Sequence, residues 1–122
     1  MTEKHPEPPA GANAVALRGR VSSAPNEREL PSGDVIVTFR LVVGRDPSPM
    51  TKTMTKTSKQ SSDWVDCVAW GGRVKRSVTT WRVGDFVEVE GALRRRFYRV
   101  EARTSTRVEV EVLTGRLVER AA

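Results

Sequence analysis

Two tryptophans, Trp64 and Trp70, are the side chains whose type and spacing most directly suggest a chemistry. In a strand they would share the outward face, with the small side chains of Val65, Cys67 and Ala69 facing inward. Successive outward positions are about 7 Å apart, so the two rings leave room for separate bases. Exposed rings that stack on any base predict binding of single-stranded nucleic acid without sequence preference. The alternative is that a tryptophan packs under a loop or in a subunit interface.

A run of arginines interleaved with aromatics follows later in the chain. Guanidinium groups bind phosphates and neighbouring rings offer stacking surfaces, so the run favours a surface for single strands. It supplies the candidate contacts Arg94, Arg95, Arg96, Phe97, Tyr98 and Arg99. The alternative is that these arginines form salt bridges with Glu88, Glu90 and Glu101, which are close in sequence. We favour the nucleic-acid interpretation.

The remaining candidate cations lie on two strands and in one loop. The chain has 21 Lys and Arg against 15 Asp and Glu, a formal net charge of +6, which predicts attraction to polyanions. Arg18 and Arg40 fall on the outward faces of the first two predicted strands, and a Thr- and Ser-rich loop carries Lys52, Lys56 and Lys59. This loop is either a solvated linker or a basic arm that closes over a phosphate backbone.

No arrangement of residues suggests catalysis, a cofactor or a metal site. The one cysteine, Cys67, lies in an apolar run and the one histidine, His5, lies in a Pro-rich tail, which leaves too few zinc ligands and no nucleophile–base pair. Acids on the predicted strands alternate with core residues, as ordinary exposed positions do, at Asp66, Glu88, Glu90, Glu109 and Glu111. We therefore predict that the protein is not an enzyme.

The sequence offers no element for crossing or entering a membrane. No apolar run approaches the roughly 20 residues of a spanning helix. The N-terminal segment MTEKHPEPPAGA has no apolar stretch that could act as a signal peptide. We therefore expect a cytoplasmic protein.

Hydrophobic periodicity divides the chain into five strands and one helix. After a disordered tail over 1–12, the expected order is a strand over 13–21, a loop over 22–34, a strand over 35–44, a flexible basic loop over 46–63, a strand over 64–70, a helix over 73–81, a turn over 82–85, a strand over 86–93 that continues into the arginine run, and a last strand over 106–113. This order predicts an all-β fold, a five-stranded OB-fold barrel with one short helix between strands 3 and 4. The barrel domain spans 13–118, and 119–122 form a short end.

Alternating apolar side chains predict which residues fill the barrel. Those expected to point inward are Val15, Leu17, Val21, Val35, Val37, Phe39, Leu41, Val43, Val87, Val89, Leu93, Val108, Val110 and Val112. Val74, Val78 and Trp81 recur at helical spacing, so Trp81 is assigned to the core. Gly91 inside a strand predicts a bulge or a sharp bend.

Five landmarks occur in an order that resembles one known family. They read NAVALRGRV, SGDVIVTFRLVVG, DWVDCVAWGGR, WRVGDFVEVEGALRRRFY and VEVEVLTGRL. From Asn13 to about Val118, the chain resembles the bacterial single-stranded-DNA-binding protein family. The resemblance implies an OB barrel that forms a homotetramer and binds single-stranded DNA in replication, recombination or repair, in association with the nucleoid.

The resemblance also implies roles for individual residues. Aromatics matching Trp64, Trp70 and Tyr98 stack on bases, and arginines matching Arg94 and Arg96 meet phosphates. The remaining candidates rest on the charge and ring patterns described above.

The chain departs from the family pattern at three places. The segment after the second strand, Gly44-Arg45-Asp46-Pro47, lacks the family's further stacking tryptophan, and Asp66 stands where a basic residue is common. The family's acidic tail, which recruits replication and repair proteins, does not follow Ala122, so we expect a specialised paralogue or a shortened chain without that recruitment. These changes predict that the chain binds single-stranded DNA more weakly than a housekeeping member of the family does, with more of the binding carried by charge. An RNA-binding or protein-interaction OB module is the alternative function.

Overall fold

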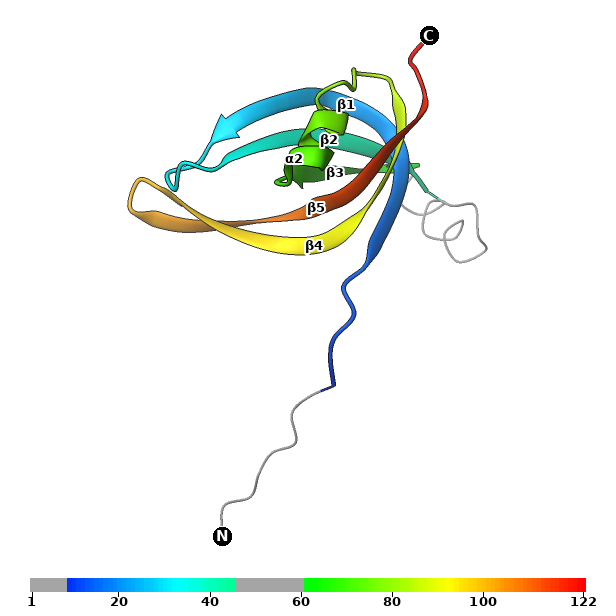
Figure 1. The fold of residues 1–122 in the computed structure, drawn as a ribbon. Helices are drawn as coiled ribbons and strands as arrows, with labels where there is room; N and C mark the ends of the chain where they lie inside the picture. The colour runs from blue at the N-terminus through cyan, green and yellow to red at the C-terminus, as the bar shows by residue number, and fades with distance from the viewer. Residues whose placement is uncertain (1–8, 46–60) are drawn as a thin grey trace.

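Five strands close into a barrel with one short helix beside it. The computed structural model describes residues 9–45 and 61–122. Its elements, in chain order, are β1 (Val15–Glu29), β2 (Val35–Gly44), β3 (Ser62–Ala69), α2 (Gly72–Val78), β4 (Phe86–Val100) and β5 (Arg103–Glu119). Around the barrel the strand order is β1-β2-β3-β5-β4, with β1 paired to both β2 and β4 (Figure 1). The predicted OB-type barrel, with its helix between strands 3 and 4, is confirmed.

The first strand is longer than the sequence pattern suggested. The expectation of a loop over 22–34 was wrong, because β1 runs to Glu29 and pairs with β2 up to the contact between Glu29 and Val35. Register shifts between Val21 and Asn26 let the strand bend, and Pro25 lies within this irregular stretch. Only residues 30–34 form the turn that ends this hairpin. Pairing with an apolar neighbour strand therefore outweighs the weak strand propensity of this segment.

The core lies inside the barrel and is closed at one end by the residues around α2. Its buried members include Val21, Val37, Phe39, Leu41, Cys67, Val87, Val89, Val110 and Val112, with Val15, Leu17 and Val43 packed against it. Val74 and Val78 of α2 are buried, as predicted. Trp81 follows the helix rather than ending it, yet it is only 4% exposed and meets Phe39 edge-on, with 5.5 Å between ring centroids. Burial raises the pKa of the Cys67 thiol to about 12, so this cysteine is an inert core residue.

Three side chains expected in the core are exposed. Leu93 is 49% exposed because β1 pairs with β4 only as far as Gly91, and Val108 is 45% exposed because β3 meets β5 only near Val110. Val35 lies at the turn end of the β1–β2 hairpin, where it pairs with Glu29. The last strand is also longer than the 106–113 expected, since β5 spans the range given above. The barrel therefore ends before its strands do.

Gly91 forms the bulge that the sequence predicted. The β4–β5 register shifts between Glu90 and Gly91. A Cβ at Gly91 would collide with the backbone carbonyl of Glu111 on the facing strand. A glycine is therefore required at this close approach of the two strands.

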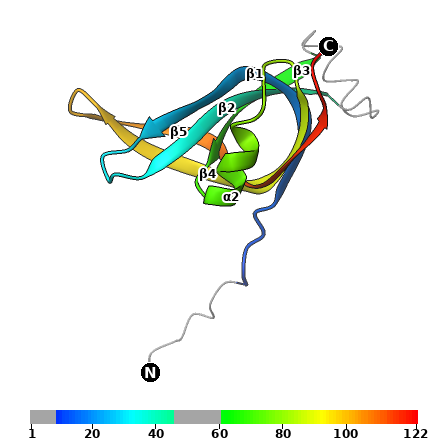
Figure 2. The same cartoon turned by 45° about the horizontal axis from the view of Figure 1, so that its top comes forward.

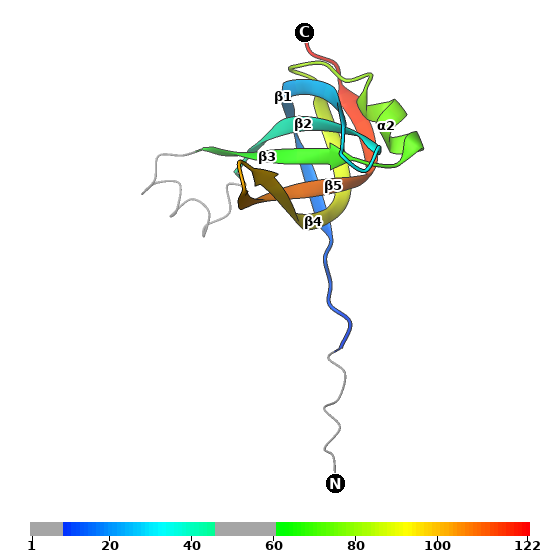
Figure 3. The same cartoon turned by 90° about the vertical axis from the view of Figure 1, so that its left-hand side faces the viewer.

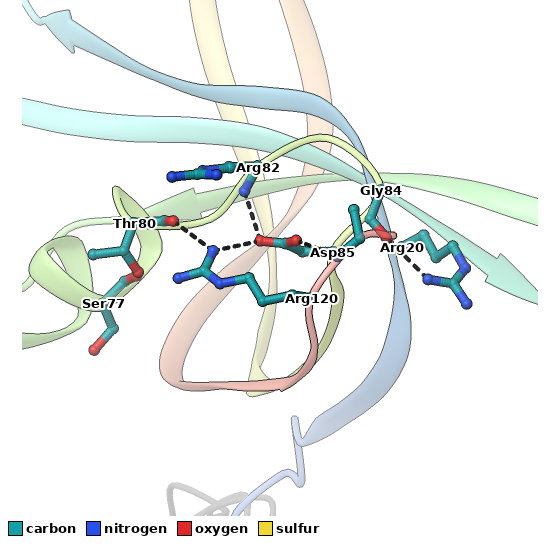
Figure 4. Close-up of polar contacts among 8 residues, drawn as sticks. Arg20, Ser77, Thr80, Arg82, Gly84, Asp85 and Arg120 are labelled. Atoms are coloured by element: carbon teal, nitrogen blue, oxygen red, sulfur yellow. Dashed lines mark hydrogen bonds and ion pairs between the residues drawn. The ribbon is translucent and has the colours of Figure 1, made fainter.

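A buried carboxylate, Asp85, ties the chain's last residues to the turn before β4. Figure 4 shows it accepting hydrogen bonds from the backbone N–H of Arg82 and from the Arg120 guanidinium, each at 2.8 Å. The backbone N–H of Ala121 also donates to it at 2.8 Å. The Ala121 bond, followed by those from Arg82 and Arg120, holds the pKa of Asp85 below its usual range.

We expect Asp85→Asn to lower the thermal midpoint by about 5 °C or more at neutral pH, because it removes a buried charge from its donors. A carboxylate with a depressed folded pKa stabilises above its unfolded pKa and loses that contribution as the pH falls through the folded value. The gap between variant and wild type should therefore narrow in acid, as followed by circular dichroism. Exposed Glu90, changed to Gln, is the control. An equal difference in thermal midpoint at every pH would show that Asp85 stabilises the fold through its hydrogen-bond geometry and not through its charge.

Candidate nucleic-acid interface

Two hairpins project from the same end of the barrel and bound a groove. The β1–β2 hairpin and the longer β4–β5 hairpin reach past the barrel on one side (Figures 1 and 2). The β4–β5 hairpin ends in a tight turn at Glu101 and Ala102, both with positive φ. The groove between the hairpins has a volume of about 850 Å³. Its charged and aromatic lining is Arg28, Glu29, Arg96, Phe97, Tyr98, Arg99 and Arg107.

The groove combines exposed rings with guanidinium groups. Phe97 is 65% exposed and Tyr98 38% exposed. Arg107 holds its guanidinium carbon 5.7 Å from the centre of the Tyr98 ring. Sequence reasoning placed Phe97 and Tyr98 correctly on an exposed surface but missed Arg28 and Arg107. Arg28 lies in a segment whose sequence predicts a loop. Arg107 lies in a predicted strand, where alternation marks it as outward-facing but does not show that it faces the groove.

A second aromatic site lies on the outer face of β2 and β3. Trp64 is 61% exposed, and the Arg40 guanidinium carbon sits 4.1 Å from its ring centre. Arg40 Nε also lies 3.1 Å from Asp66 Oδ1. Trp70, 39% exposed, follows the end of β3. Both predicted tryptophans are therefore accessible, and Asp66 is ion-paired with Arg40 on the same face as Trp64.

The groove and the β2–β3 face are contiguous. A smaller hollow of about 220 Å³ is lined by Arg40 and Asp66 on one side and by Arg107 and Glu109 on the other. Because Arg107 lines both the groove and the smaller hollow, a strand of nucleic acid could pass from the hairpins to Trp64 without leaving the surface. Figure 3, which looks toward the hairpin ends, shows β3 crossing between the two hairpins.

The arginine run makes salt bridges across the β4–β5 ladder, not with the acids proposed from sequence. Arg94 Nε lies 3.0 Å from Glu111 Oε1, and Arg96 Nε lies 3.1 Å from Glu109 Oε1. Arg95 donates to the Thr106 hydroxyl at 3.1 Å. The expected partners Glu88, Glu90 and Glu101 take no part in these pairs. The salt-bridge alternative therefore holds for two of the arginines, with partners that only the strand register reveals.

Glu109 is the most buried charge of this surface, with only 3% of its side chain exposed. Burial raises its carboxyl pKa, and the nearby Arg96 and Arg107 oppose that rise. The Nε of Arg96 is also buried and has no hydrogen-bond partner among the described residues, so the pair is held by charge rather than by a well-aligned hydrogen bond.

Arg18 lies away from this surface, and the three candidate lysines lie outside the described residues. Arg18 lies on the outer side of β1 and β4, ion-paired with Glu88, which Arg116 also approaches. It lines neither the groove nor the β2–β3 hollow. Lys52, Lys56 and Lys59 lie in the segment that the structure does not describe. At the base of that segment, Arg45 and Asp63 join β2 and β3 through two contacts of 3.1 Å.

Neither a metal-binding cluster nor a membrane-spanning helix occurs in the described part of the chain. Among residues 9–45 and 61–122, no group of three or more His, Cys, Asp or Glu is placed to hold a metal ion. No helix in those ranges has the length and apolar content to cross a membrane.

Comparison with known proteins shows which family shares this sequence. The single-strand binding protein family model matches residues 12–118. Single-stranded DNA-binding protein A of Bacillus subtilis strain 168 is 31% identical over 87 residues, which cover 70% of this chain and 46% of the relative. Single-stranded DNA-binding protein of Bacillus cereus is 30% identical over 102 residues, covering 83% and 55%. The chain thus spans about half the length of the curated relatives it matches.

A solved structure shares the fold. The Plasmodium falciparum SSB complex with ssDNA superposes with a TM-score of 0.65 at 24% identity, covering 98% of this chain and 98% of that chain. At this identity the likeness supports the barrel architecture alone.

Proposed function

Because the chain belongs to the single-strand binding protein family, we propose that it binds single-stranded DNA without sequence preference and catalyses no reaction. The observation that carries the proposal is the continuous surface on which exposed rings alternate with guanidinium groups, from the hairpin groove to Trp64. OB barrels bind oligonucleotides on the β2–β3 face and between these two hairpins.

The mechanism divides the work between rings and charges. Trp64, Trp70, Phe97 and Tyr98 stack on bases, each stack contributing about 1–3 kcal/mol whatever the base. The groove arginines meet phosphates and release counterions, so affinity falls as salt rises. Arg94 and Arg96 take part only to the extent that phosphate replaces their carboxylate partners.

Several finer proposals rest on family membership. The barrel domain over 13–118 acts on DNA exposed during replication, recombination or repair, in the cytoplasm near the nucleoid. One barrel offers a short track, so we propose that copies assemble, as a homotetramer, into a longer one. Light scattering on the purified chain tests the assembly, and a monomer at all concentrations would exclude it.

Quenching of tryptophan fluorescence by poly(dT), at two salt concentrations, tests the binding mode. Strong quenching with affinity that falls as salt rises supports stacking on Trp64 and Trp70, since buried Trp81 is shielded. Salt-sensitive binding without quenching would make both rings structural. Absence of binding would favour the protein-interaction alternative, and preference for RNA of the same sequence would favour contacts with the 2′-hydroxyl.

We expect Asp66→Asn to tighten DNA binding about threefold to tenfold, because it frees the Arg40 guanidinium and removes a negative charge from the binding face. The slope of log K against log salt should steepen by about one, as for one added phosphate contact. Titrations with a labelled oligothymidine at several salt concentrations measure both. Glu90→Gln, an exposed acid that lines neither space, is the matched control. Weaker binding by Asp66→Asn would mean that Asp66 holds Arg40 in place over Trp64.

A further inference from the structure

A hollow lined by arginines lies between α2 and the end of β5, apart from the surface described above. We call it the α2–β5 hollow; its volume is about 570 Å³. It shares no lining residue with the hairpin groove or the β2–β3 hollow. Its cations are Arg73 and Arg76 from α2 and Arg116 from β5, and no acid is among the described residues that line it.

The sequence of α2 presents one face to this hollow. Arg73, Arg76 and Ser77 recur at spacings of three and four residues, which brings them to one side of the helix, and Thr80 lies in the turn that follows it. The opposite stripe, beginning at Val74, is buried against the barrel. The basic face is thus fixed in direction by the packing of the apolar one.

The positive charge of the hollow is only partly balanced. Arg116 lies 3.5 Å from Glu88, a carboxylate it shares with Arg18. Arg73 and Arg76 are exposed and make no ion pair within the described residues. Arg120, at the rim, donates to the Thr80 carbonyl at 3.0 Å, and its charge is balanced by Asp85 (Figure 4). Arg73, Arg76 and Arg116 are left with one counter-charge, which Arg116 shares with Arg18, and a polyanionic ligand would relieve their mutual repulsion.

The floor of the hollow indicates which polyanion fits. Among the described residues, the only ring that lines it is Trp81, which is 4% exposed and so closely packed on Gly115 that a Cβ there would lie 2.8 Å from the ring. Without an exposed ring, the hollow lacks the stacking surface on which strand binding depends. Guanidinium groups above an apolar floor suit carboxylates on a peptide, which accept paired N–H bonds from arginine.

We propose that the α2–β5 hollow binds an acidic segment of a partner protein, with carboxylates on Arg73, Arg76 and Arg116 and an aliphatic side chain against Trp81 and Leu117. The barrel would then hold DNA at its hairpins and a protein beside its helix at the same time. This site is independent of the proposed DNA-binding function.

The test uses a short fluorescein-labelled peptide of glutamates with one central leucine, followed by fluorescence anisotropy at low salt. We expect the full chain to bind it and Arg73→Glu and Arg76→Glu each to weaken binding about tenfold. Arg82→Glu makes the same charge change at an exposed position outside the hollow and should have a much smaller effect. Unchanged thermal midpoints show that each variant is folded.

A second arm separates peptide from nucleic acid. The peptide should bind equally well when the protein is saturated with oligothymidine, and Arg73→Glu should leave oligothymidine affinity within about twofold of wild type. Displacement of the peptide by oligothymidine, or a matching loss of DNA affinity in Arg73→Glu, would assign the hollow to nucleic acid and overturn the proposal. Failure of the wild-type chain to bind the peptide, or equal binding by all three variants, would also overturn it. The peptide titration without DNA stands even if oligothymidine does not bind.

Discussion

Arg96→Ala is expected to destabilise the fold by about 3 kcal/mol, a larger effect than removal of an exposed arginine would have. The reason is Glu109, whose side chain is 3% exposed and whose Oε1 lies 3.1 Å from Arg96 Nε. Removing one partner of a buried ion pair leaves the other charge buried without compensation. Urea unfolding followed by circular dichroism measures the loss. A change below about 0.5 kcal/mol would mean that Arg107 or solvent already balances Glu109.

The pH dependence distinguishes this explanation from a simple loss of packing. Burial already raises the pKa of Glu109, and loss of Arg96 removes a group that opposes the rise. A carboxyl with a raised folded pKa contributes most below its unfolded pKa, and the contribution is lost as the pH rises through the folded value. The defect of Arg96→Ala should therefore be largest at neutral pH and shrink in acid. Adding Glu109→Gln to Arg96→Ala should recover most of the stability at neutral pH.

This coupling matters for assigning DNA contacts. Arg96→Ala would weaken DNA binding even if Arg96 never touched a phosphate, because the hairpin that carries Phe97 and Tyr98 would be destabilised. A phosphate contact by Arg96 is therefore tested in the Glu109→Gln background, where the fold no longer depends on the ion pair.

The barrel could be predicted from sequence because its residues face two environments. Side chains such as Val87 and Val89 alternate with less buried neighbours, and this alternation predicts where the strands lie along the chain and which residues fill most of the interior. The hairpin extensions could not be predicted in the same way, because beyond the barrel both faces of a strand are exposed. The second half of β1 and the start of β5 are stabilised by their partner strands, and no local pattern marks where they begin or end.

The candidate site divides along the same line. Ring and charge types identified Trp64, Phe97 and Tyr98 as exposed, which depends on local alternation and composition. Which cation meets which acid depends on cross-strand register, so the pairing of Arg96 with Glu109 was out of reach. Arg18 shows a further limit: a closed barrel has outward positions all around it, and alternation cannot tell which of them face the groove.

Trp64→Ala is expected to weaken binding of oligothymidine about tenfold to a hundredfold, the loss of one stacked base. Trp64 is 61% exposed, so removing its ring costs little packing. The guanidinium carbon of Arg40 lies 4.1 Å from the centre of the ring and holds the ring on the β2–β3 face. Anisotropy of a labelled oligonucleotide measures the affinity, since the substitution also removes a fluorophore. The salt slope should hardly change, because no phosphate contact is lost.

Comparison of Trp64→Ala, Tyr98→Ala and the double variant decides whether one DNA strand stacks on both rings. Trp64 lies on the β2–β3 face and Tyr98 in the hairpin groove, joined through Arg107. If one strand stacks on both, each single loss should appear with a long oligonucleotide, whereas an oligonucleotide too short to reach both rings should sense only one of them. Val83→Ala, at a position 57% exposed in the turn before β4, controls for loss of an exposed apolar side chain. Equal sensitivity of short and long strands to both substitutions would place the rings at a single contact and contradict a path that passes from one to the other.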